Sequence, residues 1–135
     1  MVGTRNAVDS PSFRLRLPCE PASVPQARAQ VRKWCQELAI PDRLLADVLL
    51  AVGEAAANAV RHSGAAELET RGWTSETSLI VCVSDHGRGL PDHTPDTGYG
   101  LAVIHALTES VEFEDARPGT RVTMRFTGTV PREAS

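Results

Sequence analysis

The sequence lacks four features that would each have suggested a class of protein. Its most apolar segment, residues 44–52, is short and carries Asp47, so no membrane-spanning helix is predicted. It has three cysteines and no CxxC pair, which argues against a disulfide framework and a zinc knuckle. Its net charge of −3 argues against nucleic acid as the main partner. The first residues also lack the apolar stretch of a signal peptide, so a reducing cytoplasm is expected.

The sequence does carry a regular series of helix and strand patterns. Its 135 residues fit one domain on the usual scale of roughly 100–200 residues. Strands are expected at 13–17, 66–73, 78–84, 111–115 and 120–126, and helices at 24–38, 42–62 and 100–107. Ser23 and Asp42 are suited to cap the first two helices. This order predicts a two-layer α/β sandwich, with a mixed β-sheet and the helices on one face. The domain is expected to span 13–127, with flexible ends at 1–12 and 128–135.

The segment VGEAAANAVRHSG places Glu54, Asn58 and His62 four residues apart within the second expected helix. Four-residue spacing puts these side chains on one helix face. The carbonyl oxygen of Asn58 is a hard ligand that suits a Mg²⁺ held mostly by phosphates and water. Glu54 could accept a proton from an attacking hydroxyl. A solvated polar face gives the same pattern, and a histidine at a helix end is more often structural than catalytic.

Two glycine motifs follow later in the chain. Asp85 ends an apolar strand pattern and begins DHGRG, with glycines at Gly87 and Gly89. Glycine permits positive φ and close backbone approach to a ligand, although a simple tight turn also uses glycine. Gly98 and Gly100 precede the third expected helix, whose free N–H groups would suit phosphate. Neither motif is a Walker A loop or a dinucleotide-binding fingerprint.

Together, the order and spacing of these motifs resemble the GHKL (Bergerat-fold) ATP-binding superfamily, whose ATPase domain is histidine-kinase-like. EAAANAVRH matches its N-box, DHGRG its G1 box and GYGLAVI its G2 box, and Gly119-Thr120 precedes the last strand. The resemblance extends from about residue 13 to residue 126. Within the superfamily, the small size of the chain is similar to that of the bacterial anti-sigma factor serine/threonine kinases.

The resemblance implies an ATP and Mg²⁺ site. Asp85 would accept a hydrogen bond from the adenine amino group, and Thr120 would add a polar contact near the adenine. Asn58 would ligate Mg²⁺, and Glu54 would be the general base for a serine hydroxyl. The remaining residues implied by the resemblance would line the base, ribose and phosphates with backbone: Gly87, Gly89, Gly98, Gly100 and the N–H of Leu101.

The resemblance also implies a regulatory function. The protein would phosphorylate an anti-anti-sigma partner of the STAS type and sequester a sigma factor, and it would form a homodimer. One feature departs from larger members: the eight residues LPDHTPDT between Gly89 and Gly98 make a short, acidic lid, which predicts weak nucleotide retention. Two alternatives remain. One is a scaffold that regulates a partner by binding alone, which would not need Glu54, and the other is a detached histidine-kinase catalytic domain.

Overall fold

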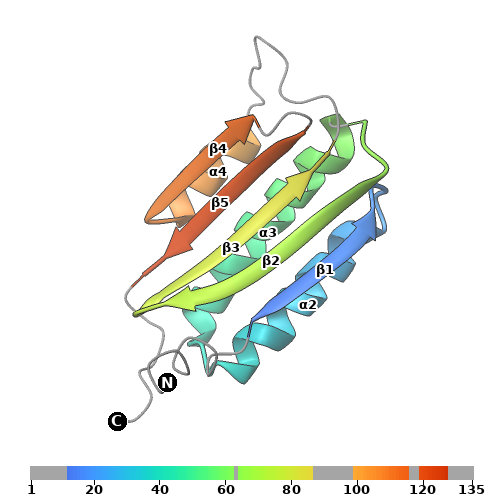
Figure 1. Ribbon diagram of the computed structural model, residues 1–135. Coiled ribbons are helices and arrows are strands. Elements are labelled where there is room, and N and C mark those ends of the chain that lie inside the picture. Colours follow the sequence, from blue (N-terminus) through green and yellow to red (C-terminus); the bar gives the residue numbers. More distant parts are fainter. Residues whose placement is uncertain (1–11, 63, 87–98, 116–118, 128–135) are drawn as a thin grey trace, which may run out of the picture.

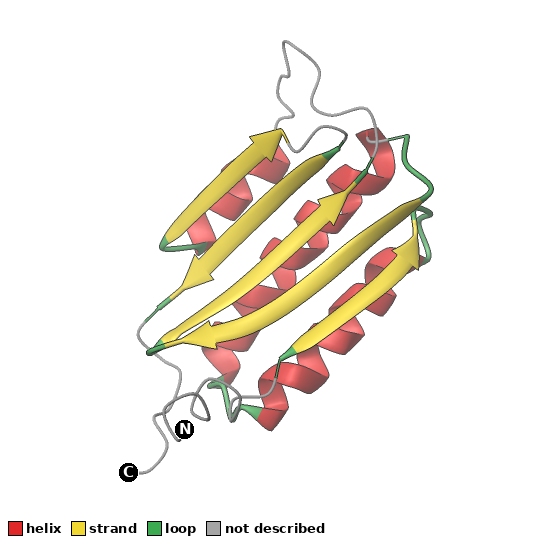
Figure 2. Cartoon of the chain, viewed as in Figure 1, coloured by secondary structure: helices red, strands yellow, loops and turns green. Residues whose placement is uncertain are grey.

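A five-stranded sheet carries three helices on one of its faces in the part of the chain that the computed structural model describes, residues 12–62, 64–86, 99–115 and 119–127 (Figures 1 and 2). The strands are β1 (Phe13–Pro18), β2 (Glu67–Ser75), β3 (Ser78–Asp85), β4 (Ser110–Asp115) and β5 (Thr120–Phe126). The helices are α2 (Ser23–Glu37), α3 (Asp42–His62) and α4 (Tyr99–Leu107). The predicted two-layer α/β sandwich is therefore confirmed. Of the ends predicted to be flexible, 1–12 and 128–135, all but residue 12 lie outside the described residues. None of the described helices is long and apolar enough to cross a membrane.

The sheet order is β1-β2-β3-β5-β4, and every described pair of neighbours is antiparallel. The sequence predicted a mixed sheet, and this detail is wrong for the described strands. The reason is the position of β5. Strands β3 and β4 run in the same direction, but β5 turns back after β4 and lies between them, so the two parallel strands are not neighbours (Figure 1).

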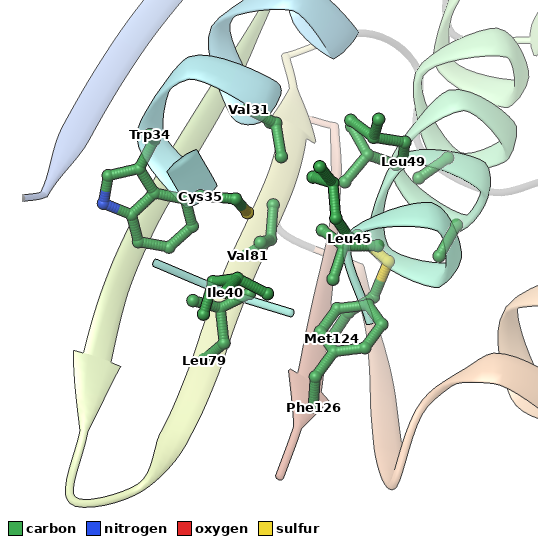
Figure 3. Close-up of a cluster of buried hydrophobic side chains, with 14 of the residues drawn as sticks. Val31, Trp34, Cys35, Ile40, Leu45, Leu49, Leu79, Val81, Met124 and Phe126 are labelled. Atoms are coloured by element: carbon green, nitrogen blue, oxygen red, sulfur yellow. The ribbon is translucent and has the colours of Figure 1, made fainter. Parts of the chain in front are cut away.

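The core lies between the sheet and the helices. Figure 3 shows apolar side chains from the helices, the sheet and the turn after α2 meeting there. They come from α2 (Val31, Trp34, Cys35), the following turn (Ile40), α3 (Leu45, Leu49), β3 (Leu79, Val81) and β5 (Met124, Phe126). Burial raises the pKa of the Cys35 thiol to about 12, so this cysteine is a neutral part of the core. Gly72 of β2 makes room for the largest of these side chains, because a Cβ there would lie 2.8 Å from the Trp34 ring and 2.4 Å from Phe13.

The opposite face of the sheet, which we call the outer face, carries no described helix (Figure 2). Strand residues alternate between the two faces, and Ile80 and Cys82 of β3 point to the outer one. Both are nevertheless buried, as the apolar run LIVCV predicted. Long side chains on the neighbouring strands explain this burial, because Ile80 lies opposite Trp73 of β2 and Arg125 of β5. Burial also raises the pKa of the Cys82 thiol, which accepts a 3.7 Å contact from Thr123.

Two predicted helix caps are wrong. Ala22 is the N-cap of α2, and the Ser23 hydroxyl instead donates a 2.6 Å hydrogen bond to the carbonyl of Pro18. This bond ties the start of α2 to the end of β1. Helix α3 includes Asp42 in its first turn, and the carbonyl of Pro41 accepts the first helical bond, from Leu45. The acidic side chain of Asp42 therefore lies where the helix dipole favours it.

Candidate functional site

Several element ends meet at one end of the sandwich. Asp85, the last residue of β3, lies opposite Leu68 near the start of β2 and opposite Thr120 at the start of β5. Helix α3 ends at His62, and four residues separate it from the start of β2. Helix α4 and strand β4 are joined by two residues at the far end, so α4 begins at this end, as Figure 1 shows. The topology therefore gathers the predicted motifs from four separate elements.

Asp85 and Thr120 form the best-defined contact at this end. They face each other in the β3–β5 ladder, and Thr120 Oγ1 donates a 2.9 Å hydrogen bond to Asp85 Oδ2. Asp85 is only 3% exposed and shares the helix-facing side of β3 with Val81 and Val83. Carboxylates are seldom fully buried unless they are hydrogen-bonded or paired. A buried, oriented carboxylate of this kind is suited to accept a hydrogen bond from a ligand amino group.

Gly119 allows β5 to approach β3 closely enough for this contact. Its φ is +100°, a conformation that side-chain-bearing residues rarely adopt. A Cβ on Gly119 would lie 1.9 Å from the carbonyl oxygen of Asp85 and 2.6 Å from the Cα of His86. Gly119 therefore fixes where Thr120 begins its strand.

The last turns of α3 bring a second group of polar side chains to the same end. Glu54 and Asn58 are half-buried at the border of the apolar stripe that packs on the sheet. Asn58 accepts a 2.7 Å hydrogen bond from Arg61 Nη2 through its Oδ1 atom. His62 is exposed at the helix end. The predicted acid and amide thus share one side of α3, with a cation beside the amide oxygen.

Only some of the residues predicted to bind phosphate lie within the described part of the chain. Gly100 and Leu101 lie in the first turn of α4, where helix N–H groups have no helical partner. The predicted contacts at Gly87, Gly89 and Gly98, and the short acidic lid between the last two, lie outside the described residues.

Two residues of this site were missed as site residues by the sequence reasoning. Gly119 was noted only as part of a motif, and its close approach to Asp85 depends on a strand pairing that sequence alone does not give. Arg61 lies within the N-box match, but no role in the site was predicted for it. Its three-residue spacing from Asn58 was the available signal, because residues three apart are neighbours on a helix.

The same fold occurs in proteins of known structure. One match is the crystal structure of the RsbU and RsbW domains of Rv1364c from Mycobacterium tuberculosis, with 22% identity and a TM-score of 0.71. The match covers 90% of this chain and 33% of that one, so this chain spans about a third of that structure. A second is the Acinetobacter baumannii histidine kinase AdeS, with 17% identity and a TM-score of 0.54, covering 85% of this chain and 67% of that one. At these identities the likeness is one of fold.

Family assignment comes from the sequence itself. No curated protein matches the chain in a direct comparison. The family model of the histidine kinase-like ATPase domain matches residues 17–126. That range contains Glu54, Asn58, Asp85 and Thr120 and every described helix and strand except the first residues of β1. The chain therefore belongs to the histidine kinase-like ATPase family.

Proposed function

We propose that the protein binds ATP with Mg²⁺ at this end of the sandwich and transfers the γ-phosphoryl group to a serine of a protein partner. In this proposal the partner is a STAS-type anti-anti-sigma factor, and the protein is a cytoplasmic anti-sigma regulatory factor that also sequesters a sigma factor. Family membership supports the ATP site. The motif resemblance described above and the fold shared with the RsbU–RsbW structure support the proposed role as an anti-sigma regulatory factor.

Each described side chain fits a separate task in this reaction. Asp85, oriented by Thr120, would accept a hydrogen bond from the adenine amino group. Asn58 would hold Mg²⁺ through Oδ1, which is the hard oxygen donor that this ion prefers. Bound Mg²⁺ would supply neutralisation of phosphate charge. Glu54, one helical turn before Asn58, would take the proton of the serine hydroxyl.

The observation that carries the proposal is the buried Asp85–Thr120 pair. A carboxylate that is 3% exposed at the end of an otherwise apolar strand is costly to bury. The surrounding elements nevertheless hold it in place, and they also bring the last turns of α3 and the first turn of α4 to the same end. This combination is expected of a ligand site.

Calorimetry with Mg·ATP tests the nucleotide site. Asp85→Asn should weaken binding at least about tenfold, since the amide presents a donor where the adenine amino group needs an acceptor. Asp47→Asn is the matched control, because Asp47 lies near the opposite end of α3 and carries the same charge. Equal affinities for the parent and Asp85→Asn would show that the nucleotide site has been assigned wrongly.

Phosphoryl transfer is tested separately, with labelled ATP and a candidate STAS protein. Labelling of a partner serine by the parent chain is the expected result. A partner that binds tightly but is never labelled would favour the scaffold alternative, in which the protein regulates by binding alone.

A further inference from the structure

The hydrogen bond between Arg61 and Asn58 occupies the atom that the proposed function needs for its metal. Arg61 Nη2 lies 2.7 Å from Asn58 Oδ1 on the last turns of α3. The other polar atom of the Asn58 amide, Nδ2, is a hydrogen-bond donor and cannot hold a cation. Any divalent ion on Asn58 must therefore share or take over the oxygen that Arg61 now uses.

Sharing is unfavourable on electrostatic grounds. A guanidinium is permanently charged, and a divalent cation on the same oxygen would be repelled by it at short distance. The ion pairs within the described ranges use Arg14, Arg16 and Arg121 and do not include Arg61. The charge of Arg61 is thus not neutralised by a described carboxylate in an ion pair.

We propose that Arg61 is a positioning residue that holds the Asn58 amide in the absence of metal and must release Oδ1 before Mg²⁺ can bind there. This inference rests on the proposed ATP and Mg²⁺ site. Arg61 holds the amide oxygen in one orientation, and it also lowers the affinity of that oxygen for metal. The protein therefore exchanges one cation for another at a single oxygen atom when Mg·ATP arrives.

Nuclear magnetic resonance of arginine side chains tests the release directly and needs no turnover. In the nucleotide-free chain, Arg61 should give a resolved guanidinium Nη–H signal, assigned by its loss in Arg61→Gln. The signal should collapse in Asn58→Ala, because the acceptor is gone. It should also collapse when Mg·ATP is added, but persist when ATP is added with a chelator. A signal that is indifferent to Asn58→Ala, or that persists with Mg·ATP, would overturn the proposal.

Calorimetry measures the competition. The quantity of interest is the metal-dependence ratio, the Kd for ATP in chelator divided by the Kd for Mg·ATP. Metal-free ATP is more negatively charged than Mg·ATP, so loss of the Arg61 charge weakens the binding of metal-free ATP more. The ratio therefore rises in Arg61→Gln whether or not Asn58 is present. We therefore compare Arg61→Gln in the parent and in Asn58→Ala. The rise should be about three- to tenfold larger when Asn58 is present.

Arg43→Gln is the matched control. Arg43 is an exposed arginine at the other end of α3, and its removal changes the net charge equally. Its ratio should equal that of the parent. Equal rises for Arg61→Gln in both backgrounds would overturn the proposal while leaving the nucleotide site standing, provided that Asp85→Asn has lost binding. A parent chain that binds no ATP would overturn the proposed function and this inference together.

Discussion

Thr120 Oγ1 donates a 2.9 Å hydrogen bond to Asp85 Oδ2 across the pairing of β5 with β3. Thr120→Val removes the donor and keeps the shape of the side chain. The buried carboxylate then loses a partner, and we expect the free energy of unfolding to fall by about 1–3 kcal/mol. We also expect the Kd for Mg·ATP to rise about three- to tenfold, because Asp85 is no longer held in one orientation. Chemical denaturation and calorimetry measure the two effects.

Thr123→Val is the control for that substitution. Thr123 lies three residues further along β5 on the outer face, where its hydroxyl contacts the Cys82 sulfur at 3.7 Å. Its replacement should leave the Kd for Mg·ATP unchanged. Similar effects of the two variants would mean that the strand, and not the Asp85 contact, determines nucleotide binding.

Glu54→Ala should separate binding from transfer. Glu54 is half-buried one turn before Asn58, so its loss removes the proposed general base without removing the adenine or metal contacts. We expect the Kd for Mg·ATP to change by less than about threefold and the rate of partner phosphorylation to fall by about 10²–10⁴. Labelled-ATP assays at saturating nucleotide check the rate. An unchanged rate would remove Glu54 from the catalytic role.

Gly119→Ala should damage both stability and binding. The new Cβ would collide with the backbone of Asp85 at 1.9 Å, and φ is +100°. We expect a loss of more than about 2 kcal/mol in the free energy of unfolding. Gly53→Ala is the contrasting variant, because Gly53 lies inside α3 and its new Cβ meets the flexible Arg28 side chain at 3.3 Å. It should be stabilising by about 0.5–1 kcal/mol, and thermal unfolding distinguishes the two.

Thr70→Val should stabilise the protein. Thr70 is fully buried on the helix-facing side of β2, and its hydroxyl has no hydrogen-bond partner among the described residues. Replacing it with a methyl group of similar shape removes the desolvation cost, worth about 1–2 kcal/mol. Thr74→Val, on the same face of the same strand but half-buried, should change stability by less than about 0.5 kcal/mol. A destabilised Thr70→Val would indicate that this hydroxyl has a partner.

Glu69 makes part of the stability depend on acidity. Burial pushes the pKa of Glu69 up, but the hydrogen bonds and charges of Arg14 and Arg16 outweigh it and hold the pKa below 4.5. The folded state therefore prefers ionised Glu69, and its contribution is present above about pH 4.5 and lost as the pH falls through the folded pKa. Glu69→Gln should cost up to about 1 kcal/mol at neutral pH and nothing at low pH.

Urea unfolding at pH 7 and pH 3, at low and high salt, measures this difference. Glu114→Gln is the comparison, since Glu114 and its partner Arg121 are both 45% exposed and joined at 2.9 Å. It should cost less than Glu69→Gln. A pH-independent difference between the parent and Glu69→Gln would contradict the assignment.

Most elements of the fold could be predicted because their signals are local. The helix of residues 42–62 and the strand of residues 120–126 match α3 and β5 at both ends, since each has a clear apolar period. The predictions that were wrong, the mixed sheet and the Ser23 cap, depended on contacts with residues elsewhere in the sequence. The sheet is antiparallel because β5 lies between β3 and β4, and no local pattern specifies that insertion. Ser23 has the chemistry of a cap, but the Pro18 carbonyl is its acceptor in the folded chain.

The candidate site divides in the same way. Glu54 and Asn58 were predicted to share a helix face, and α3 confirms this, because their spacing follows from helix geometry. That Asp85 meets Thr120 was implied only by the family resemblance, since 35 residues separate them in the sequence. The Arg61–Asn58 bond depends on side-chain rotamers, which spacing permits but does not choose.

β5 lies inside the sheet but follows all the other described strands in the sequence, and this also determines when the site can form during synthesis. A nascent chain that has reached only β4 contains Asp85, Asn58 and Glu54, but it lacks the strand that fills the gap between β3 and β4. Until residues 120–126 leave the ribosome, β3 has one unpaired edge along its apolar run LIVCV, the kind of edge on which chains aggregate. Completion of the sheet and completion of the Asp85 site are thus one event that waits for residues 120–126, and a chaperone that shields an exposed strand would be needed most just before it.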